Sequence, residues 1–133
     1  MSYVLDTSAL LALRDDENGA SRVNELLEQA ATGNTVLFGC FITLMEIMYR
    51  VWKDDGQAAG RRAYAQCQTL PITWVHETPE LLESAARLKA LYPISLADAW
   101  IAATALQCKA ILVHKDPEFE AVAGLEQEKL PYR

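Results

Sequence analysis

Four acidic residues stand out because each lies in a segment that is otherwise apolar. Asp6 directly follows an apolar run, Glu46 and Asp98 are each the only charged residue of an apolar stretch, and Asp116 precedes Pro117. Carboxylate oxygens are the ligands that Mg²⁺ and Mn²⁺ prefer in proteins. If the fold brings these four side chains together, their chemistry predicts a site for a divalent cation.

Each of the four acids also has a purely structural interpretation. Asp6 and Asp116 could cap helices at their N-termini, and proline after Asp116 suits the first helical position. Arg50 follows Glu46 by four residues, the spacing of an ion pair along a helix. In two pairs a hydroxyl residue precedes an acid with the three-residue spacing of a capping box: Thr43 with Glu46, and Ser95 with Asp98.

Strand-like and helical segments alternate along the chain, which predicts a mostly parallel sheet covered by helices on both faces. Ligands of such sheets bind beyond the carboxyl ends of the strands, and there Asp6 and Asp116 would meet. The expected strands are 3–5, 35–38, 72–75, 110–113 and a short one within 125–130, and the expected helices are 8–14, 20–31, 43–53, 57–69, 79–91, 95–108 and 117–123.

The helix around Asp98 favours the cation interpretation, because it is apolar on nearly every side and is expected to be buried. A buried carboxylate without a cation costs several kcal/mol or takes up a proton. Ser95 alone can cap this helix, so capping does not require Asp98. Converging carboxylates repel one another unless a cation lies between them.

Composition limits the class of protein. The chain has 133 residues, 51% hydrophobic and 23% charged, with no repeat or linker, so we expect one domain over residues 1–133. No apolar run approaches the roughly 18 residues of a membrane span, and the start lacks a signal-peptide pattern. We therefore expect a cytoplasmic protein that does not contact membranes, with Cys40, Cys67 and Cys108 reduced and buried. The net charge of −6 disfavours a protein that simply coats nucleic acid.

Four segments in order resemble the motifs of the PIN-domain family, specifically its VapC-type toxin ribonucleases of type II toxin–antitoxin systems. The likeness covers essentially the whole chain, and its motifs lie at residues 4–10, 42–47, 94–105 and 112–119.

The resemblance implies a three-layer α/β/α fold and metal-dependent hydrolysis of RNA phosphodiester bonds, leaving 5′-phosphate and 3′-hydroxyl ends. It makes Asp6, Glu46, Asp98 and Asp116 the catalytic and metal-binding residues, with Mg²⁺ or Mn²⁺ as cofactor. Asp6 and Asp98 would bind the ion directly or through water, while Glu46 would orient or deprotonate the attacking water. It also implies a homodimer and a cognate antitoxin that covers the acidic pocket.

The sequence departs from the family pattern at one place. The family usually has Thr or Ser two residues before the fourth acid, often followed by Gly, where this chain has His114 and Lys115. His114 is either a strand-end histidine bonded to the backbone or a residue near the site. Lys115 could offset the charge of Asp116 or contact a phosphate.

Two further groups have open interpretations. Basic residues on two consecutive helices, together with Lys115, are either an RNA-contacting rim or a solvated face: Arg50, Lys53, Arg61 and Arg62. A set of apolar residues belongs either to the core or to a groove for a partner: Met45, Met48, Val51, Trp52 and Tyr64.

Other α/β classes fit less well. A phosphate-accepting response-regulator domain normally has paired acids after its first strand, and Asp6 is followed by Thr7. A haloacid-dehalogenase-like phosphatase needs a second aspartate at the place of Ser8. The alternative that remains is a non-catalytic or regulatory PIN-like RNA-binding domain, suggested only by His114 and Lys115.

Overall fold

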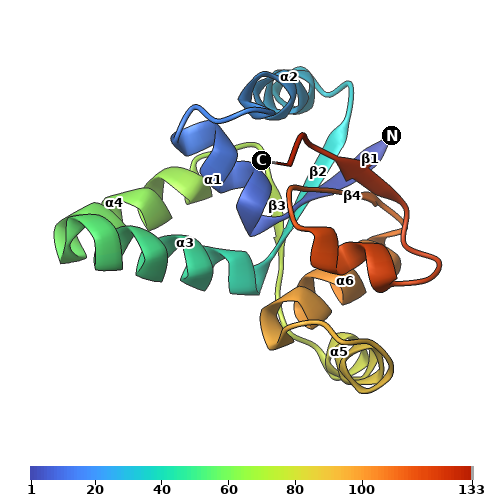
Figure 1. Ribbon diagram of the computed structural model, residues 1–133. Helices are drawn as coiled ribbons and strands as arrows, with labels where there is room; N and C mark the ends of the chain where they lie inside the picture. The colour runs from blue at the N-terminus through green and yellow to red at the C-terminus, as the bar shows by residue number, and fades with distance from the viewer. Residues whose placement is uncertain (133) are drawn as a thin grey trace.

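The computed structural model describes residues 1–132. Within them, helices alternate with the strands of one sheet (Figure 1). The elements are β1 (Ser2–Leu5), α1 (Thr7–Arg14), α2 (Ala20–Ala31), β2 (Val36–Cys40), α3 (Phe41–Asp55), α4 (Gln57–Gln68), β3 (Thr73–Val75), α5 (Pro79–Leu91), α6 (Leu96–Cys108), β4 (Ile111–His114), the 3₁₀ helix η1 (Pro117–Ala121) and β5 (Gln127–Lys129).

The sheet has the strand order β3-β2-β1-β4-β5, and every neighbouring pair among residues 1–132 is parallel. The chain adds β2 and β3 on one side of β1 and then crosses to add β4 and β5 on the other. The order therefore reverses between β1 and β4, and open parallel sheets bind ligands at this kind of crossover. The parallel sheet expected from the sequence is confirmed.

Two apolar cores lie on opposite faces of the sheet and make the fold a three-layer α/β/α structure. Tyr3 and Leu5 point to the face covered by helices α1 to α4, and Val4 points to the face covered by α5, α6 and η1. This alternation follows from the two-residue period of a strand. Burial on both faces explains why the strands read as short continuous apolar runs.

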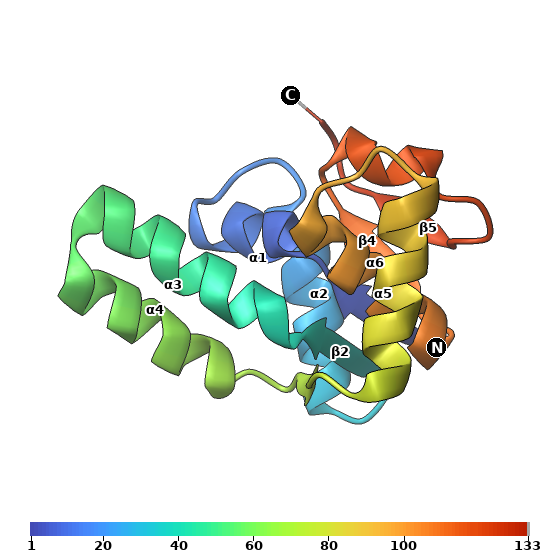
Figure 2. The ribbon, with the colours of Figure 1, turned by 90° about the horizontal axis from the view of Figure 1, so that it is seen from below.

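Helices α3 and α4 form an antiparallel hairpin that extends away from the sheet in both views (Figures 1 and 2). Gly56 ends α3 with a φ of 98°, a left-handed value that glycine adopts without strain. At Gly60, a Cβ atom would lie 2.7 Å from the carbonyl oxygen of Met48. Glycine there lets α4 pack directly on the α3 backbone, which fixes the direction of the helix that carries Glu46.

Helix α3 starts earlier than the sequence indicates. It begins at Phe41, directly after β2, with Cys40 as an N-cap that contributes no side-chain hydrogen bond. The expected start at Thr43 was therefore two residues late, because a hydroxyl followed by an acid resembles a capping box.

The thiols of Cys40 and Cys67 are buried, and that of Cys108 is partly exposed; all three are free. Among residues 1–132, no helix combines the length and apolarity that crossing a bilayer requires.

Candidate active site

Asp6 lies at the carboxyl end of β1, where its backbone N–H bonds to the carbonyl of Val113 at the end of β4 (3.0 Å). It is the N-cap of α1: its Oδ2 accepts the backbone N–H of Ser8 (3.0 Å) and also the Ser8 hydroxyl. The Ser8 oxygen in turn accepts the backbone N–H of Lys115 (2.9 Å). One serine hydroxyl therefore connects the ends of the two strands that flank the crossover.

The second carboxylate oxygen of Asp6, Oδ1, is buried and has no hydrogen-bond partner within residues 1–132. Burial of an acceptor without a partner is costly. Because Ser8 supplies both protons that Asp6 needs as a helix cap, Oδ1 is not required for capping. The capping interpretation is correct for one oxygen and leaves the other unexplained.

Glu46 is positioned by two threonines rather than by a capping box. The hydroxyl of Thr7, in the first turn of α1, donates to Glu46 Oε1 (2.6 Å) and lies 3.0 Å from the hydroxyl oxygen of Thr43. Thr43 lies inside α3 and does not cap it, so the alternative interpretation of Thr43 and Glu46 as a capping box is wrong. The other alternative, an ion pair between Glu46 and Arg50, does not form within 4.0 Å in the described residues.

Asp98 has no capping contact either. The Ser95 hydroxyl caps α6 by accepting the backbone N–H of Asp98 (3.1 Å), as the sequence predicts. In a capping box, the acid three residues on would accept the N–H of the capping serine. Here that N–H donates instead to Glu118 of η1. Glu118 takes over this role, and the Asp98 carboxyl is available at the site.

The pKa values of two acids indicate that the carboxyl groups converge. The pKa of Asp6 is raised to about 6, mainly by burial. Two hydrogen bonds from Ser8 act to lower this pKa, whereas the charges of Glu46 and Asp116 act to raise it. The pKa of Asp98 is raised to about 9, and burial is the largest cause. The charge of Asp6 and side-chain hydrogen bonds with Asp116 and Glu118 raise it further. These interactions connect Asp6 with Glu46 and Asp116, and they connect Asp98 with Asp6, Asp116 and Glu118.

Asp116 follows β4 and is the N-cap of η1, with Oδ1 accepting the backbone N–H of Glu118 (2.9 Å). Its own backbone N–H donates to His114 Nδ1 (3.0 Å). Because Nδ1 accepts, the imidazole proton is on Nε2, which donates to Gln127 Oε1 (2.8 Å). His114 is fully buried, and burial lowers its pKa. It is therefore a neutral strand-end histidine whose backbone partner is Asp116.

Replacing His114 with phenylalanine tests this role. Phenylalanine keeps a ring beside Phe119, whose centroid is 5.0 Å from the imidazole, but leaves Gln127 Oε1 and the Asp116 N–H without their partner. We expect His114→Phe to lower the free energy of unfolding by about 2 kcal/mol, measured by urea denaturation. Gln127→Leu should lower the free energy of unfolding less in the His114→Phe protein than in the wild type, because both residues belong to one hydrogen-bond network. Equal losses in the two proteins would contradict a shared network.

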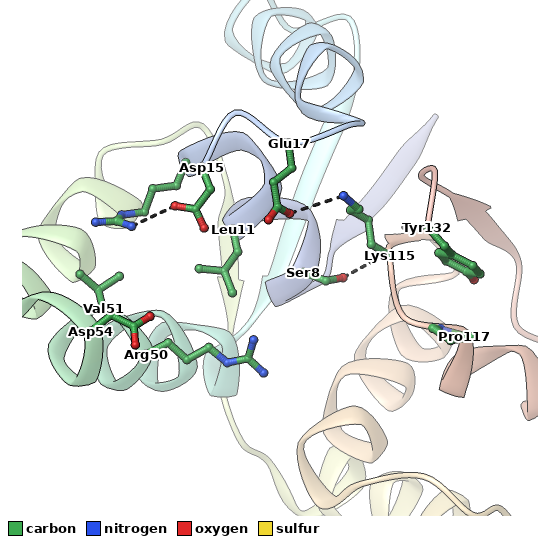
Figure 3. Close-up of a pocket in the computed structure, with 11 residues that line it drawn as sticks. Ser8, Leu11, Asp15, Glu17, Arg50, Val51, Asp54, Lys115, Pro117 and Tyr132 are labelled. Atoms are coloured by element: carbon green, nitrogen blue, oxygen red, sulfur yellow. Dashed lines mark hydrogen bonds and ion pairs between the residues drawn. The ribbon is translucent and has the colours of Figure 1, made fainter.

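Lys115 lines a cavity of about 530 Å³ next to the acids, called here the polar cavity (Figure 3). Its ammonium group is nearly buried and lies 3.4 Å from Glu17, so it does not simply neutralise Asp116. The polar residues that define this cavity are Ser8, Arg14, Asp15, Glu17, Arg50, Asp54, Lys115 and Tyr132.

A second cavity of about 460 Å³, called here the apolar groove, lies between α3 and α6. Met45 is 56% exposed and Leu96 67% exposed, a high exposure for side chains of this type. Val51, in contrast, belongs to the core. The groove is defined by Ile42, Met45, Glu46, Tyr49, Leu96 and Trp100.

The basic residues expected at a rim separate into two groups. Arg50 and Lys115 line the polar cavity. Lys53, Arg61 and Arg62 are exposed on α3 and α4 and line neither of the two cavities described above.

The acids fit a divalent cation in their chemistry, although they are not arranged as a ready-made cage. Among residues 1–132, no three Asp, Glu, His or Cys side chains are grouped closely enough to hold a metal ion as they stand. Mg²⁺ usually keeps several waters and uses only one or two protein carboxylates, so a cage of three direct ligands is not required. The unpartnered Oδ1 of Asp6 and the raised pKa of Asp98 are features that a shared cation would relieve.

Three residues of the site were not identified from the sequence: Ser8, Glu118 and Tyr132. Ser8 stands two residues after a capping aspartate, which is a usable signal for a hydroxyl that bonds the cap. Glu118 has no such signal, because its partner Ser95 is 23 residues away in the chain. Tyr132 lies beyond the last strand and joins the cavity only through the fold.

The PIN domain family model matches residues 3–125. The chain therefore belongs to the PIN domain family, as the resemblance of its four motifs predicts. No curated protein sequence is significantly similar to the chain.

Solved structures share the fold. VapBC2 from Rickettsia felis, bound to a promoter DNA fragment, has 20% identity and a TM-score of 0.78 over 98% of this chain and 100% of that chain. VapC20 from Mycobacterium tuberculosis, described as a Sarcin-Ricin loop cleaving toxin, has 20% identity and a TM-score of 0.72 over 92% and 95%. VapBC-5 from the same species, described as a member of the VapBC family of toxin–antitoxin systems, has 19% identity and a TM-score of 0.66 over 97% of each chain.

Proposed function

We propose that the protein is the toxin of a toxin–antitoxin pair and acts as a Mg²⁺- or Mn²⁺-dependent endoribonuclease. The observation that carries the proposal is the meeting of Asp6, Glu46, Asp98 and Asp116 at the crossover of the sheet, where Asp6 Oδ1 is buried without a partner. The structural relatives support the choice of reaction, since one of them is described as a Sarcin-Ricin loop cleaving toxin.

The roles of the residues follow from their contacts. Asp6 Oδ1 and the Asp98 carboxyl would hold the cation, directly or through water, and Asp116 would complete the acidic pocket. A bound Mg²⁺ or Mn²⁺ lowers the pKa of water and neutralises charge on the phosphate. Glu46 is held by Thr7 through one oxygen, Oε1, so its other oxygen can orient or deprotonate the attacking water.

RNA is the proposed substrate. Arg50 and Lys115 lie on the wall of the polar cavity. The exposed side chains of Lys53, Arg61 and Arg62 would contact the phosphates of a longer RNA further along α3 and α4. These charges would offset locally the acidic total of the chain.

The proposed protein partners are a cognate antitoxin and a second copy of the chain. The apolar groove between α3 and α6 offers exposed Met45 and Leu96 beside Glu46, a position from which a bound segment would cover the acids. Relatives solved as VapBC support an antitoxin partner. Toxin and antitoxin would meet in the cytoplasm.

Cleavage of total cellular RNA by the purified, partner-free protein tests the proposed function. We expect cutting with Mg²⁺ or Mn²⁺ and none with EDTA, and the products should carry 5′-phosphate and 3′-hydroxyl ends. Cutting that persists in EDTA would contradict a metal-dependent reaction. RNA binding without any cutting would favour the alternative, a regulatory PIN-like RNA-binding domain.

A further inference from the structure

Two cavities lie near the acids, and their linings differ in polarity. The apolar groove is lined by apolar and aromatic side chains with Glu46 as the charged member, and none of its lining residues is basic. The polar cavity is lined by three basic side chains, those of Arg14, Arg50 and Lys115, and by three acidic ones, those of Asp15, Glu17 and Asp54. An RNA strand whose scissile phosphate lies at the acids must continue past one of these cavities, and phosphate favours the one with cations.

The three cations of the polar cavity are not equivalent. Arg14 pairs with Asp15 (3.1 Å) and with Asp55 (3.3 Å), and Lys115 pairs with Glu17 (3.4 Å). In the part of the chain that the structure describes, Arg50 has no carboxylate within ion-pair distance. Its charge is therefore the one that is not already matched by a paired carboxylate.

Arg50 is also directed toward the site. Figure 3 shows its guanidinium extending from α3 into the cavity, on the side where Ser8 lies in the first turn of α1. Burial acts to lower the pKa of Arg50 and is the largest single cause. A hydrogen bond with Tyr49 and the charges of Glu46 and Asp6 together outweigh it, so the pKa of Arg50 is raised.

Tyr132 supplies an aromatic ring on the far side of the cavity from α3 (Figure 3). Its hydroxyl donates to Glu120 (3.0 Å), and its ring centroid lies 6.2 Å from that of His114, so the ring is held from both ends. A fixed aromatic ring is a stacking surface for a nucleobase. The volume of about 530 Å³ is in the range of small-molecule sites.

We propose that the polar cavity is the subsite for the single nucleotide next to the scissile phosphate, with Arg50 on its phosphate and the Tyr132 ring against its base. This inference rests on the proposed function, because it requires an RNA strand at the acids. Asp54, also on the wall, would repel a second phosphate and limits the subsite to one nucleotide. The subsite would make Tyr132 a determinant of the preferred base.

The test measures binding of a fluorescein-labelled tetrauridine RNA, and of the same RNA with one abasic position, by anisotropy at several salt concentrations. Asp98→Asn protein in Mg²⁺ serves as the background so that the probe is not cut. We expect Arg50→Gln to weaken binding about tenfold and to reduce the salt slope by about 0.7, the value for one phosphate contact to a single strand. Arg87→Gln, on exposed α5, removes the same charge elsewhere and should leave both unchanged.

For the base, we expect Tyr132→Leu to weaken binding at least about fivefold and to remove the preference for the intact RNA over its abasic form. Tyr132→Phe keeps the ring and should keep that preference. Two results would overturn the subsite. One is an equal loss of RNA affinity in Arg50→Gln and Arg87→Gln, and the other is a preference for the intact over the abasic RNA that is unchanged in Tyr132→Leu. Thermal melting of each variant identifies any that fails to fold, and Arg50→Lys then replaces Arg50→Gln, with the phosphate contact expected to survive.

The outcome is separable from that of the proposed function. If the wild type cuts RNA with Mg²⁺ but the Arg50 and Tyr132 variants bind the labelled RNA as tightly as the Asp98→Asn protein does, only the subsite is wrong. If no RNA is cut while the variants follow the expected pattern, the cavity binds a nucleotide and the proposed reaction is wrong.

Discussion

Asp98→Asn is expected to lower metal-dependent RNA cleavage by at least about 100-fold, because even groups that only orient metal ligands cost about 10- to 100-fold when they are removed. Asparagine has nearly the same shape, and Ser95 caps α6 through the backbone of residue 98, so the helix start does not depend on the carboxylate. The loss should appear in kcat together with a weaker affinity for Mn²⁺, measured by electron paramagnetic resonance titration of the protein without RNA.

Asp16→Asn is the matched control. Asp16 is exposed, lies outside the cluster of acids, and has a left-handed φ of 51° that asparagine tolerates well. It makes the same chemical change and should retain wild-type cleavage and Mn²⁺ affinity. Full cleavage by Asp98→Asn would show that the acids at the crossover do not form the active site.

In the metal-free protein, the stabilisation that the protonated carboxyl groups of Asp6 and Asp98 contribute is expected to be lost as pH rises from about 4 to about 9. The folded state holds protons more tightly than the unfolded chain, because the pKa rises from 3.8 to about 6 at Asp6 and from 3.8 to about 9 at Asp98. The stabilisation is complete below the unfolded value and is lost as pH rises through the folded values. Glu46, Asp116 and Glu118 face these two groups and contribute to the shifts.

Thermal melting in EDTA at a series of pH values measures this loss. Because other acids also titrate, the informative quantity is the difference in melting temperature between each variant and the wild type. As pH rises, Asp98→Asn should become more stable relative to the wild type, whereas the melting temperature of Asp16→Asn should change in parallel with that of the wild type. Mg²⁺ or Mn²⁺ binds the deprotonated carboxylates, so its stabilising effect should grow with pH. A constant difference between Asp98→Asn and the wild type from about pH 5 to about pH 9 would refute the assignment of the raised pKa to Asp98.

Local patterns predicted the elements of this fold well, because strand burial, helix periodicity and Pro or Gly boundaries are properties of neighbouring residues. The sheet places Asp6 and Asp116 at its carboxyl edge, as the parallel topology requires. Ser95 caps α6 as its spacing indicates. Thr43 shows the limit of such patterns: its spacing to Glu46 fits a capping box, yet its hydroxyl lies next to that of Thr7, which is 36 residues away.

The contacts that organise the site are the part that sequence could not provide. Glu118 bonds Ser95 across 23 residues, and no local pattern indicates which acid will reach a given helix start. For His114 the sequence left two interpretations open. The structure selects between them through Gln127, a residue on the edge strand β5 whose amide is itself oriented by a bond to the carbonyl of Phe119 (2.9 Å).

The hydrogen bond from the backbone of Lys115 to Ser8 determines which substitutions the joint between the two strands tolerates. The donor is a main-chain N–H, which every residue except proline possesses. The tie between the two strand ends therefore places no demand on which side chain stands at position 115, only that it is not proline. A substitution of Lys115 by any residue except proline would leave this main-chain tie in place, and with it the Ser8 hydroxyl that orients the carboxylate of Asp6. The joint between the two strand ends is therefore independent of the side chain that position 115 contributes to the polar cavity.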